Sequence, residues 1–287
     1  MKKVVLICGL ALAGAFTFAP VARVQAQIDM PAPSPTATLS QKIGLTNVTI
    51  AYSRPSAKGR KVFGDLVPFG ELWRTGANAA TKITFADEVT INNQKVPAGD
   101  YSLYTIPTAS DWTIVLNKNT KNWGTDGYKQ EEDVVRFTVK SEKSSNAVES
   151  FTMNIANNAM NSSDIELAWE NTLVRFKVTA EVDSRVMEQI KAKTSPKKDA
   201  GTYYQAARYY FDTDKDLKQA LEWVSKSVEL EPERYWVVLL KANIQVKLKD
   251  YKGAVETAKK AKDLAAKDND NGYVRMSQKI TDEYSKK

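Results

Sequence analysis

The residues best equipped for chemistry in this chain of 287 residues lie between positions 54 and 78. This segment places fork-shaped and point-charge donors beside an indole ring and an amide: Arg54, Lys58, Arg60, Lys61, Trp73, Arg74 and Asn78. Guanidinium groups suit carboxylate, sulfate or phosphate because their N–H donors meet two oxygens at once. An indole ring can stack on a sugar or a peptide. The segment therefore predicts a site for a small anion or a carbohydrate, with all but the two lysines as candidate binding residues.

A structural role is the more ordinary interpretation of the same residues. Arg54 and Arg74 would then hold the loop by bonding backbone carbonyls or buried carboxylates, and Trp73 would fill the core. The connection from Arg54 to Thr81 is too long for a simple turn. A connection of this length is usually functional or covers the edge of a core. Both interpretations stay open from the sequence.

Four further aromatic residues form a second candidate set. Trp112 and Trp169 stand in alternating, strand-like runs, which favours core packing. Trp123 and Tyr128 stand in a loop rich in Gly, Asn and Asp, so these two join the candidate ligand-binding residues.

Catalysis has few residue types to draw on. The chain contains no histidine, and its one cysteine is Cys8, which excludes Ser-His-Asp and Cys-His mechanisms as well as thiolate or imidazole zinc sites. Carboxylate pairs could still hydrolyse a glycan, and the acidic clusters are Asp87-Glu88 and Glu131-Glu132-Asp133. Adjacent strand residues point to opposite faces, however. We therefore assign no catalytic residue and keep a glycan hydrolase as the weakest alternative.

Two acidic segments resemble calcium loops without meeting their requirements. The segment that starts at Asp212 has Leu217 and Trp223 where an EF-hand needs glycine and glutamate, and the one that starts at Asp268 has Lys279 at its twelfth place. Asp216 is better explained as the cap of a helix that begins at Leu217. We expect no metal and no other cofactor.

The N-terminus has the layout of a secretory signal peptide over residues 1–26. Lys2 and Lys3 precede an apolar stretch from Val4 to Ala19, and small residues lead up to Gln27. The apolar stretch is shorter than the roughly 20 residues that span a membrane. We expect an exported protein, periplasmic or extracellular, with no membrane span and with a disordered, proline-containing leader over 27–35.

Residues 36–182 show the period-two pattern of β-strands. Val48, Ile50 and Tyr52 alternate with smaller or polar residues, and about ten such runs are separated by turn signals such as Asn92-Asn93. The further runs lie at 82–86, 89–92, 101–106, 112–117, 134–140, 150–155, 164–170 and 172–179. This predicts an antiparallel β-sandwich, similar to a jelly roll, with a core under one face of each strand.

The pattern changes to a helical period after Ala180. We expect a helix and a linker over 183–200 and a helical domain over 201–287. Residues 216–220 recur as 250–254, and this offset of 34 residues is the tetratricopeptide period. Helices are expected near 201–211, 216–230, 235–248, 251–266 and 271–285. The fold class is therefore α+β and multidomain, with a β-sandwich followed by a short tetratricopeptide-like array.

The β domain also resembles a known bacterial family. The resemblance rests on the stretches Gln41–Gly44, Val48–Ser56, Lys58–Gly64, Leu66–Gly70, Leu72–Asn78 and Gly99–Pro107. They are similar to the family catalogued as domain of unknown function 2911, over about residues 35–180. The resemblance implies an exported β-sandwich domain, sometimes joined to tetratricopeptide helices, and it implies no reaction.

Three functional hypotheses follow. The leading one is a non-enzymatic binding or scaffold protein of the cell envelope, whose helical repeats offer a surface to a protein or peptide. The second is a β domain that binds a small anion or a glycan at the loop over 54–78. The third is the glycan hydrolase. The net charge is +7, of which Lys2, Lys3 and Arg23 of the predicted signal peptide account for +3. The rest of the basic excess is spread over the helical part, which does not favour a nucleic-acid partner.

Overall fold

The computed structural model describes residues 30–194 and 199–287. The predicted signal peptide and the start of the predicted leader lie outside the described residues, as do residues 195–198 of the predicted linker. The described part of the leader, residues 30–35, contains no helix or strand, and the first strand begins at Thr36.

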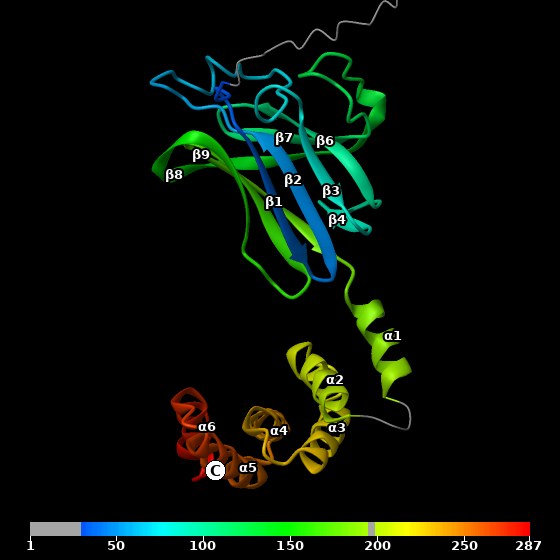
Figure 1. Ribbon diagram of the computed structural model, residues 1–287, viewed down its shortest axis with the longest axis vertical. Coiled ribbons are helices and arrows are strands. Elements are labelled where there is room, and N and C mark those ends of the chain that lie inside the picture. Colours follow the sequence, from blue (N-terminus) through cyan, green and yellow to red (C-terminus); the bar gives the residue numbers. More distant parts are fainter. Residues whose placement is uncertain (1–29, 195–198) are drawn as a thin grey trace, which may run out of the picture.

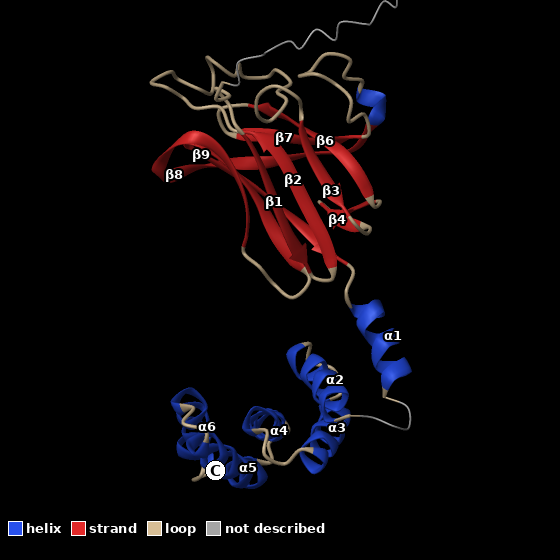
Figure 2. Ribbon diagram, in the orientation of Figure 1, coloured by secondary structure: helices blue, strands red, loops and turns tan. Residues whose placement is uncertain are grey.

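The N-terminal part is a sheet of nine antiparallel strands (Figures 1 and 2). The strands are β1 Thr36–Ile43, β2 Thr46–Ser53, β3 Thr81–Phe85, β4 Val89–Ile91, β5 Gln94–Val96, β6 Gly99–Pro107, β7 Asp111–Asn117, β8 Asp133–Ala156 and β9 Ser162–Ala180. Their order across the sheet is β1-β2-β3-β6-β7-β8-β9-β4-β5. A short 3₁₀ turn, η1 Gln130–Glu132, precedes β8.

The sheet folds into two layers because β8 belongs to both. The first part of β8 pairs with β7 and its later part pairs with β9. The register with β9 shifts between Lys143 and Thr152, and Glu170 opposite this segment has a positive φ of 48°. Irregularities of this kind bend a strand and increase its twist. The bend lets the inner faces of both layers share one core, as a sandwich requires.

The strand count differs from the prediction at these two long strands. The runs expected at 134–140 and 150–155 are parts of β8, and those at 164–170 and 172–179 are parts of β9. The interruptions between these runs looked like turns in the sequence. In the structure they are bulges or irregularities, and the pairing of β8 with β9 continues on both sides of them. Two strands, β1 and β5, were not among the predicted runs.

The predicted alternation holds where it was clearest. Val48, Ile50 and Tyr52 are all buried in the core, while Thr49 between them faces outward. The Tyr52 hydroxyl accepts a hydrogen bond from the Met153 backbone N–H at 3.0 Å, which ties β2 to the second layer. Asn92 and Asn93 both have positive φ in the β4–β5 hairpin, as predicted for a tight turn.

Six helices follow the sheet. They are α1 Asp183–Lys193, α2 Ala200–Asp212, α3 Leu217–Leu230, α4 Tyr235–Lys247, α5 Tyr251–Lys267 and α6 Asn271–Tyr284. The last five match the predicted ranges within two residues, so the α+β fold class is confirmed. None of the helices in the described part of the chain combines the length and apolarity needed to cross a membrane.

The 34-residue repeat reappears as equivalent structure. Ala220 of α3 and Ala254 of α5 are both fully buried where neighbouring helices approach closely. Asp216 accepts hydrogen bonds from the N–H groups of Lys218 and Gln219, and Asp250 accepts one from Gly253. The predicted capping role of Asp216 is therefore confirmed.

Helix α1 contacts both parts of the chain. Arg185 lies 3.2 Å from Asp87, in the turn before β4. Asp183 accepts a hydrogen bond from Tyr209 of α2 at 2.7 Å and pairs with Lys215 at 2.8 Å. The partly exposed pairs contribute little each, and the buried side chain of Ile190 adds an apolar contact to them.

The Asp216→Ala variant tests the first cap. Two backbone N–H groups of α3 would lose their acceptor, and we expect the free energy of unfolding of the helical array to fall by about 1 kcal/mol. Urea unfolding followed by circular dichroism measures this change. Asp216→Asn keeps a capping oxygen and should stay within a few tenths of a kcal/mol of the parent; equal losses in both variants would contradict the capping role.

Candidate ligand-binding site

One cavity lies at the end of the β domain where the long connections meet. The connection from β2 to β3 and the connection from β7 to β8 both lie at this end, opposite to the helices (Figure 1). The cavity has a volume of about 420 Å³. The residues that carry its polar and aromatic character are Arg60, Glu71, Trp73, Arg74, Asn78 and Trp169. Four of the seven predicted site residues therefore line one hollow.

Trp73 supplies the floor of this cavity and is also part of the core. Only 8% of Trp73 is exposed, and its ring stacks on Trp169 at 5.8 Å with an angle of 22° between the planes. Its indole N–H donates to the Gly76 carbonyl at 3.1 Å. The backbone of Trp73 also exchanges two hydrogen bonds with Thr105 of β6. The segment that carries Arg74 is thus anchored on the sheet.

Arg74 follows Trp73, and its guanidinium group has more N–H donors than it uses in hydrogen bonds within the described residues. Its Nη1 donates to the Asn78 carbonyl at 3.0 Å. Its guanidinium packs on Gly124, where an added Cβ would come within 2.9 Å of Nη1. Among residues 30–194 and 199–287, Nε and Nη2 of Arg74 have no hydrogen-bond acceptor and no carboxylate pairs with the group. These donors are free for a ligand.

Arg60 brings a second guanidinium to the cavity wall. Nε donates to the Ala57 carbonyl at 2.9 Å and Nη2 donates to the Ser56 carbonyl at 2.8 Å. These bonds fix the side chain against its own loop and leave Nη1 without a partner in the described part of the chain. Oriented guanidinium groups are well suited to the recognition of an anion.

The backbone between Arg74 and Asn78 is strained. Thr75 has a φ of 54° although it is β-branched and fully buried, and Asn78 has a φ of 61°. Such a conformation at a β-branched residue costs on the order of 1–3 kcal/mol and persists only where the surroundings impose it. The Thr75 hydroxyl donates to Thr105 at 3.1 Å, which helps to hold it. Strain of this kind is typical of functional segments.

Glu71 is a lining residue that the sequence analysis did not single out. It is exposed, and no lysine or arginine of the described residues pairs with it. The cavity therefore presents two guanidinium groups and one carboxylate. Its proximity to Trp73 and Arg74 in the sequence was a usable signal, since all three stand in one loop.

Arg54 and the two candidates in the second connection do not line the cavity. Arg54 donates to the Phe151 carbonyl at 3.2 Å and to Thr152 Oγ1 at 2.8 Å, which is the loop-holding role expected of it. Trp123 is 65% exposed, and its backbone forms a bridge with Ala79. It lies beside the loop that carries Arg74.

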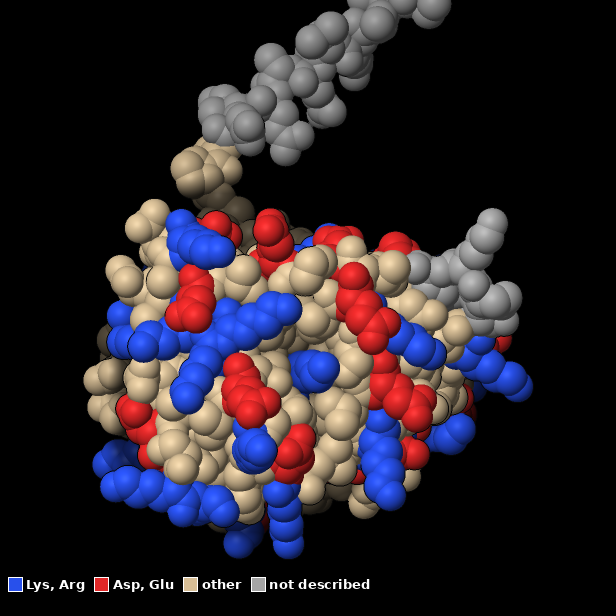
Figure 3. Space-filling model, turned by 90° about the horizontal axis from the view of Figure 1, so that it is seen from below, with Lys and Arg blue, Asp and Glu red and all other residues tan. Residues whose placement is uncertain are grey.

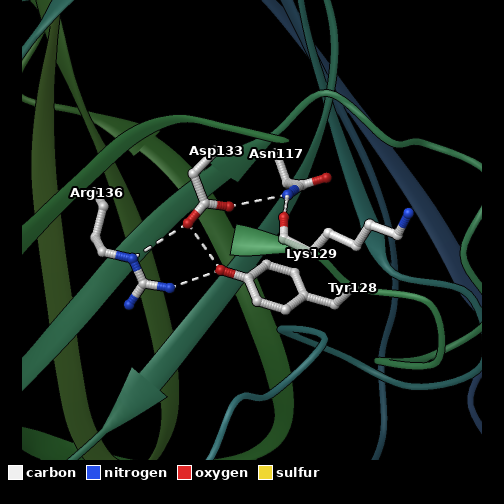
Figure 4. A network of polar contacts seen from close by, with 5 residues as sticks. All are labelled: Asn117, Tyr128, Lys129, Asp133 and Arg136. Atoms are coloured by element: carbon white, nitrogen blue, oxygen red, sulfur yellow. Dashed lines mark hydrogen bonds and ion pairs between the residues drawn. The ribbon is translucent and has the colours of Figure 1, made fainter. Parts of the chain in front are cut away.

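Tyr128 points into a polar network (Figure 4). Its hydroxyl donates to Asp133 at 2.7 Å and accepts from Arg136 at 2.6 Å, while Asn117 bonds the other Asp133 oxygen at 2.9 Å. Burial, reinforced by the Asp133 carboxylate, raises the pKa of Tyr128 to about 12. The network fastens this connection to the start of β8, so Tyr128 supports the loop.

Three of the five residues in the two acidic clusters form ion pairs, and Asp133 does so within the network, with only 8% of its side chain exposed. Asp87 pairs with Arg185, Glu88 with Lys95 and Asp133 with Arg136. Trp112 and Trp169 are each only 1% exposed, as expected for core residues. Within the described ranges, no three acidic side chains come together as a metal site would require.

The comparisons with known proteins identify the β domain. Residues 34–178 match the family described as "Protein of unknown function (DUF2911)". The chain belongs to this family. That match confirms the resemblance carried by the loop and strand motifs. No curated protein and no solved structure matched the chain.

The Tyr128→Phe variant tests the network through pH. The folded pKa of about 12 exceeds the ordinary value of 10, so stability from this group is full below pH 10 and falls as pH rises to 12. We expect Tyr128→Phe to reduce the alkaline loss of stability measured by denaturant unfolding between these values. An unchanged slope would contradict the raised pKa.

Proposed function

We propose that this protein is a binding protein whose β domain takes a small anionic ligand in the cavity beside Arg74. The observation that carries the proposal is that Arg60 and Arg74 line one hollow without a paired carboxylate in the described part of the chain. Arginine at this density in a concave, partly apolar site is typical of recognition of a carboxylate or a phosphate.

Two features support a functional role for this loop. Thr75, with its strained backbone, lies between Arg74 and Asn78. Backbone strain of this kind is concentrated at functional sites, where it holds groups in the geometry that the function needs. Trp73, whose backbone N–H and C=O both bond to Thr105 of β6, keeps Arg74 in place before the ligand arrives. Preorganisation of this kind lowers the entropy that binding must overcome.

A glycan remains within the proposal as a ligand that carries an acidic group. Trp123 presents an exposed indole next to the Arg74 loop, where a sugar ring could stack. A uronic acid would use both features, with its carboxylate at the arginines and its ring at the indole.

The helical array is a second candidate binding surface, for a protein or peptide. Helix α4 packs against α2 and α6 as well as α3 and α5, as in a curved stack of helix pairs. Positive and negative side chains are interspersed on the face seen from below (Figure 3). A mixed surface of this kind favours a protein partner over a nucleic acid.

Arg74→Ala tests the cavity. With phosphate, succinate and glucuronate as probes, we expect at least one to raise the melting temperature of the full chain through binding to the folded state. Arg74→Ala should weaken that binding by at least about tenfold, because bonds to a charged group are lost. Calorimetric titration measures the affinity.

Lys177→Ala is the matched control, since it removes a cation on the outer face of β9 that pairs with Asp164. Binding should be unchanged in this control. Equal binding in the parent and in Arg74→Ala would refute the proposal. Circular dichroism checks that Arg74→Ala remains folded; if it does not, Arg74→Lys keeps the charge and loses only the fork.

Removal of residues 195–287 tests the array. A partner that is cross-linked to the full chain and identified by mass spectrometry should be lost from the chain that ends at Thr194, provided that circular dichroism still shows the β domain. Retention of that partner would place its binding site outside the helices.

A further inference from the structure

The cavity that we propose as a ligand site carries charges of both signs, and this restricts its ligand further. Glu71 lines the same hollow as Arg60 and Arg74. We infer, resting on the proposed function, that the ligand is zwitterionic: a free α-amino acid or a short peptide that carries an ammonium group as well as a carboxylate. The carboxylate binds at Arg74 and Arg60, and the ammonium group binds at Glu71.

The first step of the argument is that Glu71 is unused. Several acidic residues of the β domain pair with a lysine: Asp100 lies 3.3 Å from Lys82, Asp164 lies 3.1 Å from Lys177 and Glu88 lies 2.9 Å from Lys95. Glu71 has no such partner among the described residues, although two arginines line the same cavity. The arginines and Glu71 thus remain separate charges in one cavity.

The second step is the effect of Glu71 on a plain anion. A like charge placed at the edge of a site opposes binding, and such repulsion is a usual source of discrimination between ligands. A ligand with only negative groups gains from the arginines and loses at Glu71. A ligand with a cationic group at one end gains at both places.

The third step concerns the apolar and aromatic residues that line the cavity. Trp73 and Trp169 lie at the base of the cavity, and Leu66 and Pro68 stand on its wall. Leu66 is 40% exposed, which is high for a leucine. Apolar and aromatic lining with a few placed polar groups suits a compact organic ligand. Here it suits the side chain or the peptide plane of an amino acid or a dipeptide.

The fourth step is size and rigidity. A cavity of about 420 Å³ lies in the range of small-ligand sites. The positions of Arg60 and Arg74 are set by hydrogen bonds to their own loop carbonyls. The distance between the two ends of the ligand is therefore selected by the protein, so that a single amino acid and a dipeptide should bind with different affinities.

The experiment uses the full chain and four probes: L-leucine, L-alanyl-L-leucine, N-acetyl-L-alanyl-L-leucine and L-alanyl-L-leucine amide. The acetyl group removes the cationic end and the amide removes the anionic end. We expect L-leucine or the free dipeptide to bind. Each blocked dipeptide should bind more weakly than the free one, by about fivefold when the Glu71 contact is lost, because that residue is exposed.

Glu71→Gln identifies the group responsible. In this variant the free and acetylated dipeptides should bind equally, while Arg74→Ala should weaken both. Glu88→Gln, on an exposed residue that pairs with Lys95, is the control and should leave the ratio of the two affinities as in the parent.

The outcomes separate this inference from the proposal on which it rests. If succinate or glucuronate binds and the zwitterions do not, or if the acetylated dipeptide binds as tightly as the free one, the ligand is a plain anion and the inference is overturned. If no probe binds and none shifts the melting temperature, both are refuted.

Discussion

The stacking of Trp73 on Trp169 is the contact on which the site depends. Trp169 belongs to β9 in the second layer, whereas Trp73 arrives from a connection between β2 and β3, so the contact fastens a long loop across the open end of the sandwich. Phe63 from the same loop packs on Trp112 at 4.8 Å and adds a second anchor. Burial of such rings contributes several kcal/mol, and loss of one from a core typically costs about 3–5 kcal/mol. The loop is therefore as much a part of the fold as the strands are.

Placement of that ring leaves little freedom to its neighbours. With Trp73 inside, Arg74 is the next residue along the chain and lies over Gly124, which has no side chain to obstruct it and adopts a φ of +68°. Thr75 then turns the chain through the left-handed region, where its hydroxyl bonds to Thr105. The core supports this strain, so the Arg74 guanidinium is held in place although no carboxylate within residues 30–194 and 199–287 pairs with it.

The connection from β7 to β8 also supports the loop that carries Arg74. The Tyr128–Asp133–Arg136 network satisfies buried polar atoms at the start of β8, and its high Tyr128 pKa keeps the phenol as a donor over the whole physiological range. The helical array is built differently, from small buried alanines and aspartate caps repeated after 34 residues. Its stability comes from contacts between neighbouring helices, and ion pairs of Arg185 and Asp183 tie α1 to the β domain and to the array.

The features that the sequence predicted by itself are those that depend on residues close to one another in the chain. The helix ranges, the Asp216 cap, the Asn92-Asn93 turn and the inward face of β2 all arise from residues within a few positions of one another, and each was predicted. The merging of four predicted runs into β8 and β9 was missed because a bulge and a turn have similar local composition. Only the tertiary structure decided that Arg54 donates to the Phe151 carbonyl, that Tyr128 belongs to a supporting network and that Glu71 shares a cavity with Arg60 and Arg74. Arg54 and Phe151 stand 97 positions apart, and a pattern of neighbours carries no information about which distant groups the core brings together. The Tyr128 network and the cavity join residues that are closer in the sequence, but the directions of their side chains are set by the packing of the loops on the core.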